Sequence, residues 1–337
     1  MRQVVLRRYC VGHPTPEDFA VVARPVPEPD PGQFLVRHIW NSVDPGTRSR
    51  LSGESSYAPA LGLGKAIDGF SVGRIVRSEA PDWPAGTLVF CAGGWRTHSL
   101  QTGQGFIGRI PATDLPLSYW IGVLGVPGLT SWFGLKETGA FRAGDRVLVT
   151  SAAGPVGATA GQLARAEGAG NVVGVAGSPD KCAWLTQEAG FDAALDYKTE
   201  PDLTAAIQNV MPDGIDLLFD NVGNAMIDRV LPLMRRGGRI VVSGQVADYN
   251  LAPETRPGIR NTTPFITQRL RMEGLVVFDF AARFPEALDG LVRLIRADQI
   301  QVREERFEGI ETMPEAFCGL FEGENFGRRV VRVGEDE

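Results

Sequence analysis

Two different patterns of apolar and polar positions follow one another along the chain. Up to about Pro127, short runs such as Phe34–Trp40 and Val72–Val76 alternate apolar and polar residues or are rich in β-branched ones. Gly and Pro separate these runs at short intervals, as is typical of strands joined by turns. This part of the sequence predicts a small antiparallel, barrel-like domain.

After Gly144 the pattern changes to short apolar runs that alternate with segments of helical periodicity. The predicted strands are Arg146–Thr150, Val172–Val175, Ala193–Tyr197, Ile215–Asp220, Arg239–Ser243 and Gly274–Phe278. Because these runs are almost continuously apolar, we expect both of their faces to be covered, as in a parallel sheet. Strands and helices in alternation indicate an α/β fold, and six strands fit the two halves of a Rossmann, doubly wound parallel sheet.

The change of pattern predicts two domains, which 337 residues are enough to fill. The segment Ile300–Val333 has strand-like ends around a helical middle near Met313–Glu322, and we expect it to return to the first domain. The predicted domains are therefore residues 1–126, completed by residues 299–337, and residues 127–298.

Composition and charge exclude several classes of function. The formal net charge is −6 and no run of Lys or Arg forms a basic stripe, so no nucleic-acid partner is expected. The most apolar stretch, Tyr119–Leu135, is too short for a membrane span and is expected to be a buried segment. The N-terminus shows no secretory signal, and the four cysteines are scattered without paired spacing. These features predict a cytoplasmic protein.

A glycine-rich turn, SAAGPVG from Ser151, joins the first predicted strand of the second domain to a helix. Gly154 would let the backbone approach a pyrophosphate, and Gly157 would let the helix pack tightly on the sheet. The helix N-terminus offers free N–H groups and a partial positive charge for the phosphates. Ala152 stands where the first Gly of the dinucleotide fingerprint normally stands. From the loop alone, a tight turn without a nucleotide is the alternative.

The end of the second strand bears on which nicotinamide cofactor would bind. NAD-binding proteins usually carry a carboxylate there to hold the ribose hydroxyls, whereas this strand runs into Gly177 and Ser178. Lys181, with Ser178 and Tyr197, could meet a 2′-phosphate, which a carboxylate would repel. The pattern favours NADP over NAD, the alternative being that Lys181 is a solvated helix residue. Ser178 is also the predicted N-cap of a helix that begins at Pro179.

The histidines and cysteines do not form a metal-binding pattern. His13, His38 and His98 are the histidines, and Cys10 with His13 makes one C-x-x-H pair. A zinc site needs two more ligands at matching spacing, and none is nearby. We therefore expect no metal, and we expect His98 to be a buried, hydrogen-bonded core residue.

Motifs spread over nearly the whole chain resemble a known family. They are PTPEDF from Pro14, NSVDP from Asn41, SYAP from Ser56, GWRTHS from Gly94, GVPGLTSWFGL from Gly125, AAGPVG from Ala152, FDNVG from Phe219, LRMEG from Leu270 and GENFGR from Gly323. The chain resembles the medium-chain dehydrogenase/reductase superfamily. More closely it resembles the zinc-independent leukotriene B4 12-hydroxydehydrogenase / prostaglandin reductase branch, which includes alkenal double-bond reductases and curcumin reductase. The resemblance implies a GroES-like β-rich catalytic domain, a Rossmann NADP-binding domain and a homodimer.

The resemblance also implies which residues contact NADP. They are Gly154, Pro155, Val156, Gly157, Ser178, Lys181, Tyr197, Asn221, Ser243, Gly244, Tyr249, Leu275, Val276, Val277 and Asn325. The stretches Ser243–Tyr249 and Leu275–Val277 would line the nicotinamide end. Zinc-dependent members of the superfamily have a Gly-His-Glu segment where Gly69-Phe70-Ser71 stands, and Phe70 cannot bind a metal. Two departures from the branch, Thr267 for a Tyr and Gly46-Thr47 for Tyr-Met, leave the choice of substrate open.

Together these features predict an NADPH-dependent reductase that acts on the C=C bond of small α,β-unsaturated aldehydes or ketones. Tyr57, in the SYAP segment, is the candidate donor to the carbonyl oxygen, on which negative charge would build. The alternative for Tyr57 is a loop tyrosine that only covers the cleft. Three other functions stay open: a quinone reductase of the same fold, a zinc alcohol dehydrogenase, which Phe70 disfavours, and a non-catalytic NADPH-binding protein.

Overall fold

The protein is described by a computed structural model that covers residues 1–54 and 59–335. It divides into two compact units. The N-terminal unit is Met1–Gly122 with Glu304–Glu337, and the central unit is Val123–Arg303. The central unit thus extends a few residues beyond the predicted range 127–298 at both ends.

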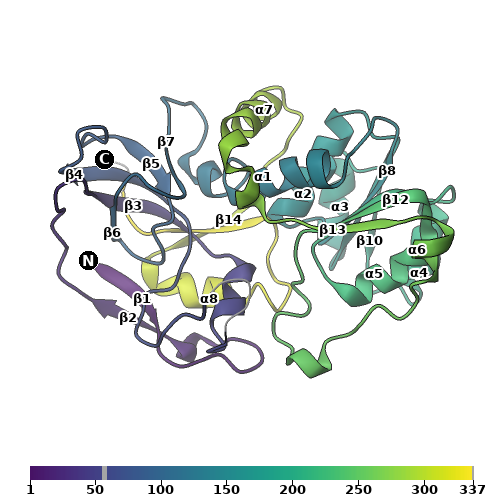
Figure 1. Cartoon of the computed structure of the whole chain (residues 1–337), viewed down its shortest axis with the longest axis horizontal. Helices are drawn as coiled ribbons and strands as arrows, with labels where there is room; N and C mark the ends of the chain where they lie inside the picture. Colours follow the sequence, from purple (N-terminus) through teal and green to yellow (C-terminus); the bar gives the residue numbers. More distant parts are fainter. Residues whose placement is uncertain (55–58, 336–337) are drawn as a thin grey trace. The chain divides into compact units, whose positions relative to one another are not determined.

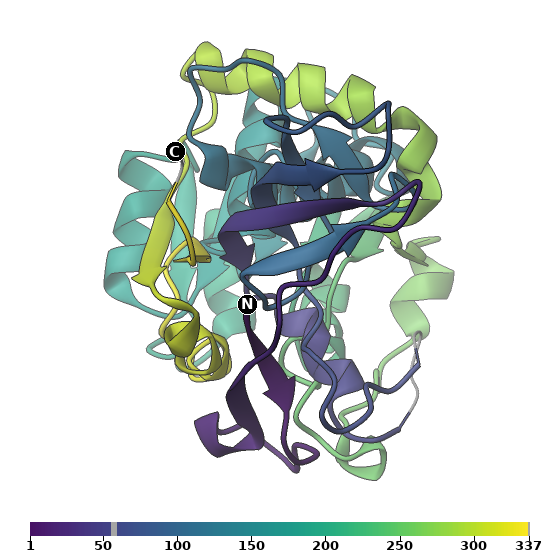
Figure 2. The same ribbon diagram turned by 90° about the vertical axis from the view of Figure 1, so that its left-hand side faces the viewer.

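The N-terminal unit is built on a seven-stranded sheet of order β14-β15-β3-β4-β5-β7, in which β6 also pairs with β3. The strands are β3 (Phe34–Ser42), β4 (Ser71–Ser78), β5 (Leu88–Cys91), β6 (His98–Gln101), β7 (Ile107–Arg109), β14 (Glu304–Glu308) and β15 (Arg328–Arg332). Only β14 and β15 pair in parallel in this sheet, as far as the structure describes it. A separate antiparallel ribbon, β1 (Arg2–Leu6) with β2 (Phe19–Ala23), lies apart from the large sheet (Figure 2).

The C-terminal segment completes the core of the N-terminal unit. Helix α8 (Met313–Cys318) brings Phe317 against Trp95, with ring centroids 5.4 Å apart, and Phe19 packs on both rings. All three rings are almost fully buried, so they supply much of the apolar contact area of this unit. Short 3₁₀ helices connect the strands: η1 (Pro16–Asp18), η2 (Pro45–Arg50), η3 (Leu117–Ile121) and η8 (Ile310–Thr312).

The central unit contains a six-stranded, fully parallel sheet of order β10-β9-β8-β11-β12-β13. The strands are β8 (Arg146–Thr150), β9 (Asn171–Ala176), β10 (Ala193–Asp196), β11 (Ile215–Asp220), β12 (Met234–Val242) and β13 (Arg271–Gly274). The chain starts at β8, runs outward to β10, crosses back to β11 and runs outward again to β13. This order is that of a doubly wound Rossmann sheet, which confirms the predicted fold class, and it places the topological switch point between β8 and β11.

Helices cover both faces of this sheet (Figure 1). Ile207 of α4 and Ile227 of α5 pack with Leu148 in the core on one face. Helices α2 and α3 lie on the other face, where a Cβ at Gly174 of β9 would be 3.0 Å from Leu185 and 3.1 Å from Phe191. The helices are α1 (Val126–Phe133), α2 (Pro155–Ala166), α3 (Pro179–Gln187), α4 (Leu203–Val210), α5 (Asn224–Val230), α6 (Thr263–Thr267) and α7 (Phe284–Arg296), with the shorter turns η4 (Gly134–Thr138), η5 (Leu231–Leu233), η6 (Pro253–Thr255) and η7 (Val277–Arg283).

The last strand of the sheet lies earlier in the chain than the sequence predicted. β13 is Arg271–Gly274, and most of the predicted run Gly274–Phe278 follows it, with Val277 already in η7. The prediction was wrong because β13 is an edge strand whose side chains are all exposed, so its sequence lacks an apolar pattern. The apolar stretch Tyr119–Leu135 forms parts of η3, α1 and η4 and is mostly buried. No helix in the described ranges is long and apolar enough to cross a membrane.

Candidate functional site

The parallel sheet brings the segments that follow its strands to one edge. Residues Thr150, Ala176, Asp196, Asp220, Val242 and Gly274 end the six strands at this edge, where ligands bind in doubly wound sheets. The predicted cofactor residues in the segments that follow are Gly154, Pro155, Val156, Gly157, Ser178, Lys181, Tyr197, Asn221, Ser243, Gly244, Tyr249, Leu275, Val276 and Val277. Asn325 precedes β15 and belongs to the N-terminal unit.

The glycine-rich turn has the geometry that its sequence predicted. Gly154 is the N-cap of α2 and Pro155 is its first residue. A Cβ at Gly157 would stand 2.5 Å from the Ser151 carbonyl oxygen, so only glycine lets the helix approach the loop this closely. Ala152 takes the place of the first fingerprint glycine and is fully buried, because the neighbouring strand has Gly174 opposite its Cβ. The first N–H groups of α2 have no carbonyl partner within the helix and can meet phosphate oxygens.

The segment after β9 forms an open corner with a cation and hydroxyl groups. Ser178 caps α3 as predicted, because its Oγ accepts a 3.3 Å hydrogen bond from the Lys181 backbone N–H. The ring of Tyr197 lies against Gly177, where a Cβ would be 2.8 Å from Cε1 of the ring. Tyr197 is 47% exposed and Lys181 is half-buried. No carboxylate directly follows β9, so the corner suits a phosphate better than ribose hydroxyls alone.

A buried hydrogen-bond network spans the switch point between β8 and β11. Thr150 and Asp220 are both fully buried, and Thr150 Oγ1 donates a 2.7 Å hydrogen bond to Asp220 Oδ1. The same hydroxyl accepts from the Asn221 backbone N–H at 2.8 Å, and Asn221 Nδ2 donates to the Thr150 carbonyl at 2.8 Å. Burial raises the pKa of Asp220 to about 6, against the lowering effect of its donors. Sequence reasoning missed Thr150 and Asp220, although each is a polar residue at the end of an apolar strand.

The segment after β12 is attached to this network through its backbone. The N–H of Ser243 donates to the Asp220 carbonyl at 2.8 Å, and the N–H of Val246 donates to the Asn221 carbonyl at 3.2 Å. Tyr249 Oη accepts a 3.4 Å hydrogen bond from the Gln245 N–H, which closes the segment on itself. The positions of Ser243, Gly244 and Tyr249 therefore depend on Asp220 and Asn221.

The segment after β13 turns its three predicted residues in different directions. Leu275 continues the sheet through a 3.1 Å hydrogen bond from its N–H to the Val242 carbonyl, and its side chain lies against Gly134. Val277 is buried, whereas Val276 is 53% exposed. All three follow the same edge of the sheet as the glycine-rich turn.

In the N-terminal unit, Phe70 stands where zinc-dependent members of the superfamily carry a histidine. Its ring packs edge-on against Phe106 at 5.0 Å, and its N–H donates to Ser42 Oγ at 2.9 Å. Ser42 Oγ also hydrogen-bonds Asp44, whose Oδ1 accepts from the buried Arg328 at 2.7 Å. Asp44 thus has a structural role in this loop. The candidate donor Tyr57 lies outside the described residues.

The C-x-x-H pair belongs to a structural loop. Burial raises the pKa of the Cys10 thiol to about 12, which keeps it protonated and a poor metal ligand at neutral pH. Arg48 Nη2 donates to the carbonyl oxygens of Cys10, at 3.2 Å, and Gly12, at 2.8 Å. Within residues 1–54 and 59–335, no group of three or more His, Cys, Asp or Glu side chains could hold a metal ion.

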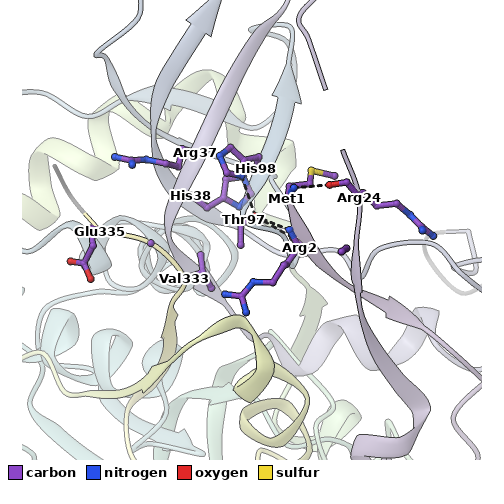
Figure 3. Close-up of a pocket in the computed structure, with 11 residues that line it drawn as sticks. Met1, Arg2, Arg24, Arg37, His38, Thr97, His98, Val333 and Glu335 are labelled. Atoms are coloured by element: carbon purple, nitrogen blue, oxygen red, sulfur yellow. Dashed lines mark hydrogen bonds between the residues drawn. The ribbon is translucent and has the colours of Figure 1, made fainter. Parts of the chain in front are cut away.

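A surface hollow of about 510 Å³ in the N-terminal unit contains none of the predicted site residues (Figure 3). His98 lines it and is only half-buried, with its Nδ1 3.1 Å from Thr97 Oγ1. The expected hydrogen bond of His98 is present, but its expected buried core position was wrong, because its side chain lines this hollow. The fully buried histidine is His38. The guanidinium groups of Arg24 and Arg37 point to opposite sides, so they do not converge on one anion.

Comparison with known proteins gives a family match within each unit and relatives that match nearly the whole chain. A family described as the N-terminal domain of oxidoreductases matches residues 2–108, and one described as zinc-binding dehydrogenases matches residues 155–293. The chain is 38% identical to the 2-alkenal reductase (NADP(+)-dependent) of Nicotiana tabacum, over 99% of this chain and 98% of that protein. It is 36% identical to the NADPH-dependent curcumin reductase of Escherichia coli K12, over 100% and 98% of the two chains.

A solved structure agrees with these matches. The crystal structure of CurA from Vibrio vulnificus in complex with NADPH superimposes with a TM-score of 0.92 at 33% identity, over 99% of this chain and 100% of that one. Fold and sequence thus define a two-unit oxidoreductase with a doubly wound nucleotide-binding sheet. The chain belongs to the medium-chain dehydrogenase/reductase superfamily, in its zinc-independent branch of alkenal, curcumin and prostaglandin reductases.

Proposed function

We propose that this protein reduces the C=C bond of α,β-unsaturated aldehydes and ketones with NADPH, by hydride transfer to the β-carbon. The observation that carries the proposal is the 38% identity, over nearly the full length of both chains, with an enzyme named for 2-alkenal reduction. The relative named for curcumin reduction supports it, because its name also joins NADPH to the reduction of a small molecule.

The edge of the central sheet fits NADP. Gly154, Gly157 and the N-terminus of α2 would hold the pyrophosphate, since glycine leaves room for close approach of the backbone. Lys181, Ser178 and Tyr197 would hold the 2′-phosphate at the corner that lacks a carboxylate. When bound, NADPH supplies the hydride from C4 of its nicotinamide. Pro155 and Val156 complete the pyrophosphate set in this proposal. The family resemblance assigns a further NADP contact to Asn325.

Residues of this chain would line the nicotinamide end and polarise the substrate. Asn221, Ser243, Gly244 and Tyr249, together with Leu275–Val277, are proposed to border the nicotinamide. Hydride addition at the β-carbon moves negative charge to the carbonyl oxygen, and a donor placed there lowers the barrier. We assign this donor role to the Tyr57 hydroxyl.

Turnover with a substrate panel tests the proposal. NADPH oxidation is followed with enones, alkenals and quinones, and the products are analysed for a saturated Cα–Cβ bond. We expect turnover of enones or alkenals, and a kcat lowered roughly 10- to 100-fold in Tyr57→Phe, since one oxyanion donor is lost. Tyr9→Phe, at an exposed tyrosine of the N-terminal unit, is the control. Turnover confined to quinones, or NADPH binding without turnover, would reject the proposed reaction.

We also propose a homodimer that forms through the β13 edge and resides in the cytoplasm. β13 has a neighbour on one side only, and Ile266, Met272, Val276 and Phe278 leave apolar surface exposed near it. An exposed apolar strand edge favours association with another strand. The four unpaired cysteines are compatible with a reducing compartment.

A further inference from the structure

We propose that Thr150 and Asp220 form a clamp across the switch point that positions the nicotinamide-binding segments, so that both are positioning residues of the reductase. Neither residue belongs to the set assigned to the cofactor above. The inference rests on the proposed placement of NADP at the edge of the central sheet.

The clamp joins two strands that are far apart in the sequence. Thr150 ends β8 and Asp220 ends β11, and the two strands are neighbours in the sheet. Their side chains meet at 2.7 Å with both residues fully excluded from solvent. A buried carboxylate that accepts a short hydrogen bond is held more firmly than an exposed one, because no water can replace the donor. The crevice where a doubly wound sheet binds its ligand begins at this pair of strands.

The second oxygen of Asp220 fixes the turn that follows β11. Asp220 Oδ2 accepts a 2.8 Å hydrogen bond from the Gly223 N–H. Gly223 has a φ of 126°, which an L side chain rarely adopts, and a Cβ there would stand 2.6 Å from Asp248 Oδ2. Asp248 is itself buried, and its Oδ2 has no hydrogen-bond partner among the described residues. The Asp220 and Asp248 carboxylates therefore both lie close to Gly223, and the turn has little freedom to shift.

Hydrogen bonds from the clamp residues hold Asn221 and the segment after β12 in place. Asn221 is held twice by Thr150, through its backbone N–H and through its side-chain amide. Because Nδ2 faces the Thr150 carbonyl, Oδ1 is directed away from that carbonyl. An acceptor in this orientation can receive a hydrogen bond from the carboxamide of nicotinamide. The carbonyls of Asp220 and Asn221 hold Ser243 and Val246 in the same way.

A pair of ligands that differ only in the nicotinamide tests the clamp. Calorimetric titration compares NADPH with 2′-phosphoadenosine 5′-diphosphoribose, which keeps the adenosine, the 2′-phosphate and the pyrophosphate. Thr150→Val removes the hydroxyl at nearly constant volume, and Thr150→Ser keeps it. Thr130→Val is the matched control, because Thr130 is also buried but its hydroxyl bonds only the Val126 carbonyl of its own helix.

We expect Thr150→Val to weaken NADPH binding on the order of 10-fold, and to change binding of the shorter ligand by less than about 2-fold. Thr150→Ser should bind both ligands as the wild type does, and so should Thr130→Val. An equal loss for both ligands would show a merely structural role and overturn the proposal, as would no loss for either.

Asp220→Asn provides a second route if Thr150→Val does not fold. Its amide group would face the donating Gly223 N–H or the Thr150 hydroxyl, so the same contrast between the two ligands is expected, and equal binding losses would again overturn the clamp. Both titrations are independent of enone turnover. If the wild type binds NADPH but reduces no enone, the proposed reaction is rejected. The comparison of the two ligand affinities still tests the clamp.

Discussion

The Cα of Gly157 lies so close to the Ser151 carbonyl that a Cβ at this position would stand 2.5 Å from the oxygen and 2.8 Å from Ala152 Cα. Both contacts are with backbone atoms, which cannot rotate away as a side chain can. The first turn of α2 thus packs tightly against the loop that precedes it, and this packing fixes the N–H groups of the turn in place. In the proposed site, this close packing would hold the N–H groups of the turn in position to bind the pyrophosphate.

Alanine substitutions at the two loop glycines should therefore have different effects. Gly157→Ala should destabilise the protein by about 1–3 kcal/mol, because the helix has to move off the loop. Gly154→Ala should cost less stability, since its Cβ would be 3.3 Å from the Ser151 oxygen at a φ of −81°, but it should weaken NADPH binding. Thermal melting and NADPH titration of both variants measure the two effects. Equal stabilities of the two variants would contradict this account.

Lys181 is expected to set the preference for NADPH over NADH. Lys181→Ala should weaken NADPH binding roughly 10- to 100-fold and leave NADH binding nearly unchanged, because a charge-assisted hydrogen bond to the 2′-phosphate is lost. Lys65→Ala, at an exposed lysine of the N-terminal unit, is the control. The measurement is the dissociation constant of each cofactor. If Lys181→Ala weakens both cofactors alike, the 2′-phosphate does not lie at this corner.

Buried His38 should make the protein less stable in acid. Its ring hydrogen-bonds Asn41 Oδ1 at 3.0 Å and Ser99 Oγ at 2.8 Å, and burial lowers the pKa of His38 to about 3. Between pH 6.5 and 3 the unfolded chain therefore binds a proton at this position that the folded chain does not. The contribution of neutral His38 to the free energy of unfolding is fully present above about pH 6.5. It falls as the pH falls, by about 2–3 kcal/mol at pH 4.5.

The variant His38→Gln isolates this contribution. It should be less stable than the wild type at pH 7, and the difference in the free energy of unfolding should shrink as the pH falls toward 4.5, because glutamine does not titrate. Denaturant unfolding at several pH values gives the two curves. A difference that stays constant over this range would show that His38 has the same pKa in the folded and the unfolded chain.

The exposed β13 edge should control the oligomeric state. Ile266, in the helix α6 that precedes β13 in the chain, is 80% exposed, so Ile266→Lys should weaken a dimer formed at this edge by at least about 10-fold if its side chain enters the interface. Leu63→Lys, at a 51% exposed leucine of the N-terminal unit, is the matched control. Sedimentation velocity over a range of concentrations reports the dissociation constant. Dimers of unchanged affinity in Ile266→Lys would place the interface elsewhere.

The order of strands and helices in the central unit, and the residues that form its turns, could be predicted from local patterns along the chain. The glycine-rich turn and the Ser178 cap were predictable, because both depend on residues within a few positions of one another. The edge strand β13 was misplaced, since a strand covered on neither face carries no apolar pattern. The motif resemblance gave the family, which the full-length relatives confirm.

Which polar residues contact one another depends on how the strands pack in the folded chain. Thr150 and Asp220 are separated by 70 positions in the chain, and nothing in either local segment indicates that β8 and β11 are neighbours. Which histidine is buried was also decided by packing, because His38 and His98 both lie in strands of the same sheet and only His38 of the two is enclosed. Local propensity acts over a few residues, whereas a buried hydrogen bond depends on strand order and on what covers each face. For this reason the sequence located the segments of the site, and the fold determined how they are held.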